Sequence, residues 1–557
     1  MNSMRKHPAF LAACLIASAP VMGQDSRPVC GPNGEAAVHA HSATGYVGWV
    51  STEILERPVP LRSGIGTIHE PVSTNSKEAQ EFYDQGLAYL QSYVWVEAAR
   101  SFHQALRNDP GLAMAYVGLS YAYSPMDFPA AVKALQKAES LSAQISDRER
   151  RRIRIRSLQL KAMSDTAKIE NELAFRDAID DALAAYPNDV VFLLLRGTAT
   201  DPSPFADGQG CQMEGAPFYE RALAQDPGNF AAEHFLTHCY ENAGRIQEAL
   251  PHALAYAHAA PNIPHAQHMC GHVLRRAGRM DDAIDRFKRA DQLELDYFRT
   301  EKVSPSIDWH YAHNLSLLAS SYQYLGQVKE AEGYFRKSGA VGAYTDYDSF
   351  NRKDWPEFLL NRHRYSEALT AAGAMTEKPS PLARAVGHVL AGYADLWLNR
   401  PAQAKSELAS ANQVVKTLAP ADVPTMLPYT EGLQAVLFAQ AQDEKRAAPL
   451  FARVIARIRL ANGPDAWTQG LFQLEFLCDT ARREGDWAAA AGLAQAMIER
   501  APDYAGAHYA LGLIAQHGHD TDTAGREFSE AETLWNEADP GLPEVAEIRR
   551  MRSAAGR

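Results

Sequence analysis

The sequence has few cysteines, no long run of β-branched residues and, after its N-terminal region, no apolar stretch long enough to span a membrane. Only 6 of the 557 residues are cysteine, which excludes a fold framed by disulfides even in an oxidising compartment. Short apolar patches instead recur at helical spacing. These features exclude a β-rich fold, and the length favours several domains or a repeat array over one compact core.

Positive charge is also in deficit. The chain has 55 Lys and Arg against 67 Asp and Glu, a formal net charge of −12. No global positive field would attract phosphate, so we expect no nucleic-acid partner. The one basic run, residues 148–156, alternates with apolar residues, and we interpret it as a solvated helix face. Gly-rich phosphate loops, nucleophile elbows and His-Glu-x-x-His motifs are missing, so no such motif assigns a reaction.

The first residues have the three parts of a secretory signal peptide. Residues 1–8 are basic, residues 9–22 are apolar, and small residues follow. We therefore expect residues 1–23 to be a signal peptide and the mature protein to be periplasmic or secreted, with no membrane span. The Leu-Ala-Ala-Cys sequence ending at Cys14 resembles a lipoprotein box. The apolar run continues past it, so a lipid anchor at Cys14 is the less favoured alternative.

An internal repeat follows. The first clear copy carries small residues at its eighth, twentieth and twenty-seventh positions and an aromatic at its twenty-fourth, in the order Gly86, Ala98, Phe102 and Ala105. Asp226-Pro227 and Ala260-Pro261 are 34 residues apart. Small residues let two helices pack closely, an aromatic fills the gap, and proline ends the unit.

This pattern resembles the tetratricopeptide-repeat (TPR) family. The resemblance implies an all-α, right-handed superhelical solenoid, and the recognisable copies indicate roughly 10–12 helical hairpins. We divide the chain into a signal peptide (1–23), an irregular N-terminal segment (24–75), N-terminal repeats (76–195), central repeats (196–345), C-terminal repeats (346–540) and a tail (541–557). Residues 198–215 and 296–308 break the period, and we expect them to be loops.

The repeat register also places the cysteines. Cys239 and Cys270 fall in neighbouring repeats and could pair with each other, as could Cys30 and Cys211. Buried free thiols are the alternative.

Histidines gather in three successive central repeats. They occupy positions two, five, nine and twelve of the first helices together with one glutamate, and in this family those positions line the concave groove. The set is His234, His238, Glu241, His265, His268, His272 and His313. Residues spaced three or four apart share a helix face, and the axes of packed helices lie roughly 8–10 Å apart. The side chains should therefore converge from neighbouring hairpins.

The local sequence around these histidines resembles a bacterial, exported TPR subfamily with the same His-rich blocks. The blocks are 233–241, 264–272 and 311–314, and a segment similar to 64–73 opens the subfamily. The resemblance covers about residues 64 to 340 and departs at Cys270-Gly271, where relatives usually carry a proline and a small residue. It implies no reaction.

Two functions fit these observations. One is a binding scaffold that holds a partner protein or peptide in the groove, with a His-rich metal site on its wall. The other is a metal-dependent enzyme with the His and Glu cluster as its active site, and the sequence does not decide whether any reaction is catalysed. Imidazole with a carboxylate suits Zn²⁺, Cu²⁺ or Fe²⁺. His310 is a further candidate, either as a metal ligand or as a hydrogen-bond donor to a ligand. His69 is expected to be an ordinary loop histidine.

Overall fold

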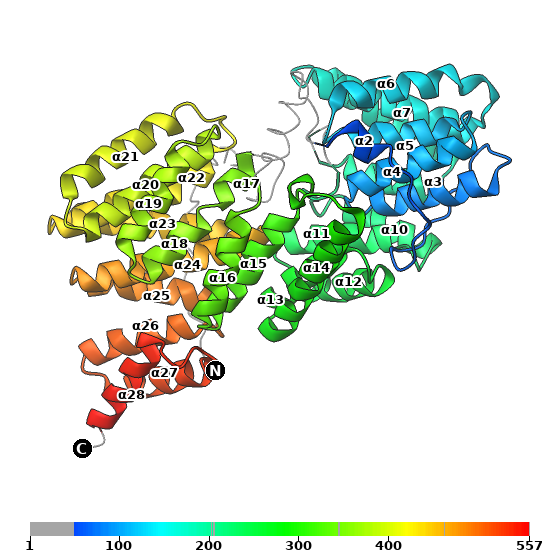
Figure 1. Cartoon of the computed structure of the whole chain (residues 1–557). Coiled ribbons are helices and arrows are strands. Elements are labelled where there is room, and N and C mark those ends of the chain that lie inside the picture. Colours follow the sequence, from blue (N-terminus) through cyan, green and yellow to red (C-terminus); the bar gives the residue numbers. More distant parts are fainter. Residues whose placement is uncertain (1–49, 202, 204–206, 343–345, 462, 556–557) are drawn as a thin grey trace, which may run out of the picture.

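The computed structural model describes residues 50–201, 203, 207–342, 346–461 and 463–555. The expected signal peptide, Cys14 and Cys30 lie outside these residues. Throughout the described residues the chain is helical and contains no strand. Consecutive helices pack as antiparallel pairs (Figure 1), and this stack of helical hairpins confirms the all-α TPR solenoid.

The hairpins follow one another along the chain. In the N-terminal half they are α3 (Lys77–Leu90) with α4 (Trp95–Asn108), α5 (Ala113–Tyr123) with α6 (Phe128–Ser140), α7 (Asp147–Ser164) with α8 (Ile169–Ala185), and α9 (Val190–Thr198) with α10 (Ala216–Gln225). The central hairpins are α11 (Phe230–Asn242) with α12 (Ile246–Ala259), α13 (Pro264–Arg276) with α14 (Met280–Glu301), and α15 (Tyr311–Tyr324) with α16 (Val328–Gly339).

The C-terminal hairpins are α18 (Asp354–Asn361) with α19 (Tyr365–Thr376), α20 (Pro381–Trp397) with α21 (Pro401–Val415), α22 (Val423–Gln440) with α23 (Glu444–Leu460), α24 (Pro464–Arg483) with α25 (Trp487–Arg500), and α26 (Ala505–His517) with α27 (Thr521–Leu534). Five short or terminal elements complete the set: α2 (Thr52–Leu55), α17 (Asp346–Asn351), α28 (Pro543–Ala555) and two 3₁₀ turns, Ser142–Gln144 and Pro305–Ile307.

The α3–α4 and α13–α14 hairpins each close around a glycine and an aromatic ring, as the repeat pattern predicts. A Cβ placed on Gly86 would lie 2.5 Å from the Phe102 ring. Gly271 stands in the same relation to Phe287, at 2.7 Å. Since no side chain fits at that distance, only glycine lets the aromatic of the second helix fill the space between the helices.

The turns inside the hairpins need a left-handed backbone. Gly244, Gly278 and Gly326 hold this position in the three central hairpins, with φ of 72°, 77° and 72°. In the α3–α4 turn the equivalent residue is Tyr93, with φ of 57°. A left-handed conformation costs a non-glycine residue roughly 1–2 kcal/mol, so something beyond the turn must hold Tyr93 there.

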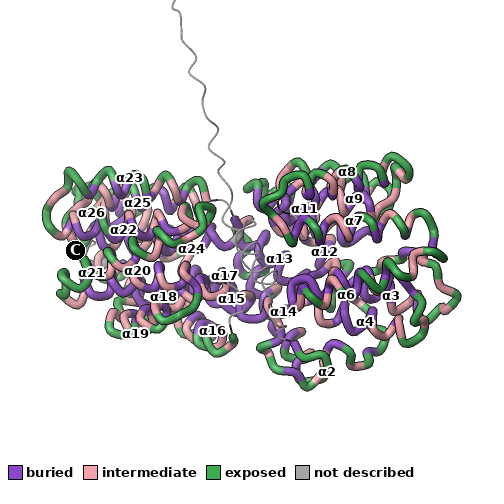
Figure 2. The backbone as a smooth tube through the Cα atoms, turned by 90° about the horizontal axis from the view of Figure 1, so that it is seen from above, coloured by how far each residue is buried: buried purple, intermediate pink, exposed green. Residues whose placement is uncertain are grey.

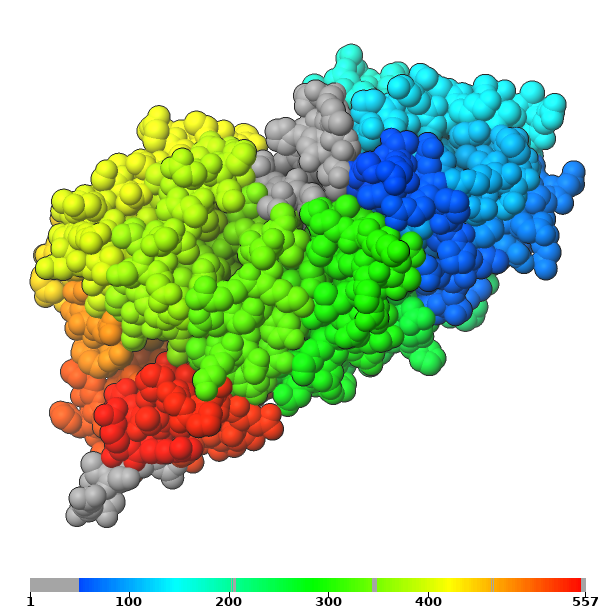
Figure 3. All heavy atoms as spheres, viewed as in Figure 1, coloured from blue at the N-terminus to red at the C-terminus, as the bar shows by residue number. Residues whose placement is uncertain are grey.

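The solenoid curls until distant parts touch. At the N-terminal end, the backbone N–H of Asn262 donates to the carbonyl of Gly64 at 2.7 Å. At the other end, the backbone N–H of Asp539 donates to the carbonyl of Gly326 at 3.1 Å, and Figure 3 shows the C-terminal helices against the central ones. The central hairpins are therefore covered from both sides, and Figure 2 shows α13 and α15 as a buried zone between two groups of helices.

Three details differ from the sequence predictions. Cys211 forms a disulfide with Cys239, so neither expected pairing forms; Cys270 is a buried free thiol. The insertion at 296–308 lengthens α14 by helix up to Glu301 before any loop begins. The segment expected to be a tail, 541–557, contains helix α28, which packs on α27. No helix among the described residues is long and apolar enough to cross a bilayer.

Candidate metal centre

Seven histidines from three hairpins meet in the buried zone. His234 and His238 lie on α11, which Asn229 caps by accepting the backbone N–H of Ala232. His265, His268 and His272 lie on α13, which begins at Pro264. His310 and His313 lie at the start of α15. All are buried except the partly exposed His313.

The first His trio consists of His234, His238 and His265. His234 Nε2 lies 3.1 Å from His238 Nε2 and 3.1 Å from His265 Nε2. Three ring nitrogens thus converge on one point between α11 and α13. One ligand atom from each residue lies within 4.8 Å of the other two.

The backbone fixes the tautomer of His234. Its Nδ1 lies 2.8 Å from the carbonyl oxygen of Gln91, and because a carbonyl only accepts, Nδ1 carries the proton. In the neutral ring, Nε2 then carries no proton, and its lone pair faces two further Nε2 atoms. One lone pair accepts one good N–H donor, so hydrogen bonding satisfies one of these two contacts at most.

The second His trio consists of His268, His272 and His313, whose candidate ligand atoms also lie within 4.8 Å of one another. His268 Nε2 is 2.8 Å from His272 Nε2. His268 Nδ1 is 3.0 Å from the amide oxygen of Asn314, whose NH₂ group donates to the Phe287 carbonyl at 3.1 Å. That second bond fixes the amide orientation, so His268 also carries its proton on Nδ1.

His310 lies between the two trios. Its ring centroid is 4.1 Å from that of His268 and 5.0 Å from that of His265. Its Nδ1 is 3.0 Å from Glu294 Oε1, while its Nε2 is buried without a hydrogen bond. With Glu294 and Asp308 it forms a third group of candidate ligands.

Burial keeps the imidazoles neutral. It lowers the pKa of His238 to about 4 and the pKa of the other enclosed rings well below the ordinary value, an effect that neighbouring imidazoles strengthen for most of them. Burial likewise raises the pKa of the Glu294 carboxyl well above its usual range and that of Asp308 to about 6. The centre therefore offers lone pairs and buried carboxyls, and the Arg275 and Arg276 guanidinium groups lie near one of its rings, His272.

Glu241 does not join the converging nitrogens. Its Oε1 is 3.4 Å from His272 Nδ1 and 3.6 Å from Arg276 Nη1, so it stands behind the imidazole, on the side away from His268. Glu241 does share a face of α11 with the two histidines, as predicted, but its carboxylate reaches the His272 ring and the Arg276 guanidinium. Glu241 therefore lies beside His272 without a hydrogen bond to it.

The histidines face inward but do not line an open groove. The Tyr93 ring covers the first trio, with centroids 4.8 Å from His234 and 5.1 Å from His265. Asp465, at the start of α24, lies 3.6 Å from His313 Nε2. A cavity of about 110 Å³ reaches His265 and His310 from beside Trp95 and Trp309, whose stacked rings are 5.2 Å apart.

Other histidines lie elsewhere. The exposed His69 pairs with Asp84 at 2.8 Å, which agrees with its interpretation as a loop histidine. Repeat spacing missed Tyr93, Gln91 and Asp465, because each comes from an element far away in sequence. Only the left-handed position of Tyr93 sets it apart, and one sequence does not show that.

Comparisons with known proteins place no function on the chain. No protein-family model and no curated protein sequence matches it. Solved structures with similar parts include MamA AMB-1, with 25% identity, 34% of this chain and 91% of that chain covered, and a TM-score of 0.24. They also include YrrB, described as a TPR protein with an unusual peptide-binding site, with 17% identity, 36% and 93% covered, and a TM-score of 0.26.

A third similar structure is a monomeric mutant of IFIT1 with Gppp-AAAA. It shows 12% identity, covers 92% of this chain and 96% of that chain, and has a TM-score of 0.35.

Proposed function

We propose that this chain is an exported TPR protein that uses its central hairpins to hold two transition-metal ions, one in each His trio. The observation that carries the proposal is the first trio, in which three buried Nε2 atoms converge around a proton-free nitrogen of His234. Convergent lone pairs repel one another unless protons or a cation lie between them.

The spacing suits a metal ion. Zinc binds imidazole nitrogen at roughly 2.0–2.1 Å, so two ligands of a tetrahedral site stand about 3.3 Å apart. The separations of 3.1 Å in the first trio and 2.8 Å in the second are close to this value. Small rotations of the rings would bring them to it.

The Nδ1 contacts support the same conclusion. A metal-bound histidine usually donates its second ring N–H to a carbonyl or carboxylate, which fixes the ring orientation. The partners here are the Gln91 carbonyl for His234, the Asn314 amide for His268 and the Glu294 carboxyl for His310. In these three residues Nε2 is the nitrogen left for a ligand bond.

Ligand type narrows the choice of ion. Both trios consist of imidazole alone, which suits Zn²⁺, Cu²⁺ or Fe²⁺. Glu241 stands behind His272, so these residues do not form the two-His, one-carboxylate set that favours a ferrous oxygenase. His310 supplies a fourth nitrogen near both trios, and Glu294 and Asp308 are carboxyls whose ionisation a nearby cation would favour.

A metal-dependent enzyme is the second candidate. The cavity of about 110 Å³ at His265 and His310 favours it, because it gives a small molecule a route to the ring nitrogens. A water molecule takes about 30 Å³, so the space admits only a few small molecules. A bound ion there would polarise such a ligand.

The proposal also includes binding of a protein or peptide partner on the outer and concave surfaces of the hairpins, because stacked TPR hairpins form extended binding surfaces. The metal-binding histidines would lie beneath those surfaces. Export rests on the N-terminal sequence, and the Cys211–Cys239 disulfide supports it, since disulfides persist in oxidising compartments.

The test is the metal content of purified mature protein with each trio removed in turn. We expect about two ions per chain in the wild type and one in either His234→Ala/His238→Ala or His268→Ala/His272→Ala. The control is His388→Ala/His508→Ala, which removes two histidines that pair with glutamates far from the centre and should keep both ions. Equal metal content in all four proteins would refute the site.

A further inference from the structure

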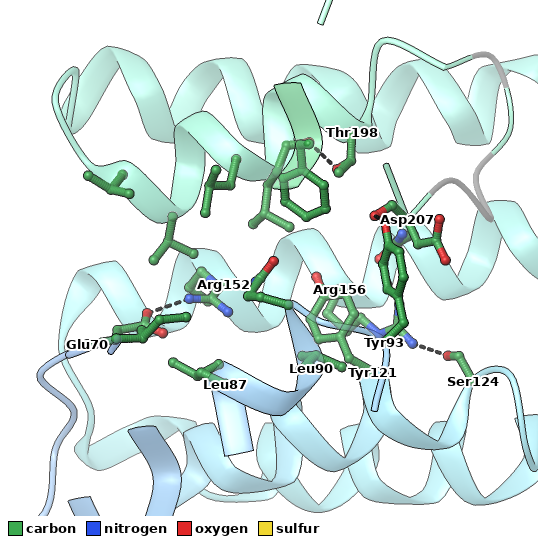
Figure 4. A pocket seen from close by; sticks show the side chains of 18 of the residues that line it. Glu70, Leu87, Leu90, Tyr93, Tyr121, Ser124, Arg152, Arg156, Thr198 and Asp207 are labelled. Atoms are coloured by element: carbon green, nitrogen blue, oxygen red, sulfur yellow. Dashed lines mark hydrogen bonds and ion pairs between the residues drawn. The ribbon is translucent and has the colours of Figure 1, made fainter. Parts of the chain in front are cut away.

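A second cavity lies in the N-terminal half, between α3, α5, α7 and α9. It measures about 380 Å³, within the usual size range of small-molecule sites. Figure 4 shows Arg152 and Arg156 of α7 at its wall beside Tyr121 and leucines of α3. Much of the remaining lining is apolar: Leu87, Leu90, Met163, Val190, Leu194 and Leu195. Asp207 and Asp226 also line the cavity, and burial raises the pKa of Asp207 to about 7.

Two of the arginines in this region are neutralised within the chain. Arg152 pairs with Glu70, which also pairs with Arg148 at 2.6 Å. Arg148 in turn pairs with Asp189 at 2.5 Å. Two guanidinium groups thus face two carboxylates. The basic run expected to be a solvated face is therefore partly buried, because these carboxylates from the N-terminal segment and α9 meet it.

Arg156 has no such partner. It is 1% exposed, and among the described residues no ion pair joins it to a carboxylate. Its guanidinium donates to the Ser120 carbonyl at 2.8 Å, to Ser120 Oγ at 3.0 Å, to Gln159 Oε1 at 2.7 Å and to Ser124 Oγ, which uses four of its five N–H groups. Tyr121 lies against it, with 4.0 Å from Cζ to the ring centroid. Burial lowers the pKa of Arg156 to about 10, which leaves it charged at neutral pH.

Two further donors at the cavity lack partners. The Arg152 Nε–H and the Tyr121 hydroxyl are buried without a hydrogen bond. Both residues line the cavity together with Arg156. An uncompensated buried cation with unused donors beside it is costly unless an anion joins it.

We propose that this cavity binds a monocarboxylate with an apolar chain. The carboxylate lies beside Arg156 and accepts from Arg152 and Tyr121, because a buried guanidinium without a carboxylate partner favours a negative charge next to it. A single carboxylate neutralises that one guanidinium. The apolar chain lies along the leucines of α3 and α9. The cavity shares a wall with the proposed metal centre, because Gln91 and Tyr93 line it and also contact His234, but none of the seven clustered histidines lines it.

The test is isothermal titration calorimetry of the full mature chain with octanoate, octan-1-ol and octyl phosphate at pH 7. We expect one octanoate site, with octan-1-ol and octyl phosphate binding at least 10-fold more weakly. Arg156→Gln should remove the preference for octanoate over octanol, and Arg156→Lys should retain most of it. Arg154→Gln, an exposed arginine on the same helix, is the matched control and should bind as the wild type does.

Leu194→Trp tests the site independently of the Arg156 variants, which could fail to fold. The larger side chain fills the apolar part of the cavity and leaves the charged residues unchanged. It should abolish octanoate binding with an unchanged circular dichroism spectrum. Equal affinity for octanoate and octanol, tighter binding of octyl phosphate, or wild-type binding by Arg156→Gln would overturn the proposal.

Discussion

His234 and His265 come from successive hairpins, yet their Nε2 atoms lie 3.1 Å apart in a region closed to solvent. The contact exists because α11 and α13 are first helices of adjacent repeats and present the same face inward. His238 completes the trio from the next turn of α11. Repetition alone thus builds a three-nitrogen site.

The strained turn at Tyr93 gives a prediction about access. Tyr93→Gly should speed removal of bound metal by EDTA several-fold, because the ring covering His234 and His265 is lost. The melting temperature should fall, because relief of the left-handed strain, about 1 kcal/mol, offsets only part of the roughly 3–5 kcal/mol lost with a buried aromatic side chain, here one that is 3% exposed. Asn399→Gly relieves the same strain in the α20–α21 turn and should leave the extraction rate unchanged. Equal extraction rates in both variants would contradict the covering role.

The glycine and aromatic contact predicts opposite effects of one substitution at two sites. Gly86→Ala should destabilise the protein by about 1–3 kcal/mol, because its Cβ would lie 2.5 Å from the Phe102 ring. Gly373→Ala, inside α19 with no atom within 4 Å of the new Cβ, should stabilise it by about 0.5–1 kcal/mol. Denaturant unfolding followed by circular dichroism distinguishes the two, and a loss of stability at both sites would contradict the packing account.

The Cys211–Cys239 disulfide closes a loop of 28 residues that contains α10 and most of α11. Its removal in Cys211→Ser/Cys239→Ser should cost about 3–4 kcal/mol by loop entropy. Dithiothreitol should lower the melting temperature of the wild type towards that of the variant. The variant itself should not respond, and an equal response of both proteins would show that another effect is measured.

Glu357 predicts a pH dependence. Burial raises its pKa to about 7, against a usual value of 4.5, and the nearby Lys353 offsets the rise in part. The folded chain therefore holds a proton that the unfolded chain releases between these values, so this group's stabilisation is full below about pH 4.5 and is lost as pH rises to about 7.

Glu357→Gln removes that titration. The melting temperature of the variant relative to the wild type should rise between pH 5 and pH 8. Glu377→Gln, at an exposed position, should show no such trend. A constant difference between Glu357→Gln and the wild type across this range would contradict the raised pKa.

The repeat fold was readable from the sequence because its determinants are local. Gly86 and Phe102 lie 16 residues apart, and the spacing recurs. The inward face of the histidines followed from the same register. Their burial did not, because it depends on contacts such as that between Gln91 and His234, 143 residues apart. Glu241 was placed on the correct face, but which neighbour its carboxylate reaches depends on Arg276 of the next hairpin.

The most direct measurement of the central claim is X-ray absorption at the metal edge of the purified mature protein. We expect each metal ion to have a first shell of about three or four nitrogens near 2.0 Å, with the multiple scattering of imidazole rings. In His268→Ala/His272→Ala the amount of metal per chain should be halved. A shell made of sulfur or mainly of oxygen, or imidazole scattering that does not change in that variant, would contradict it.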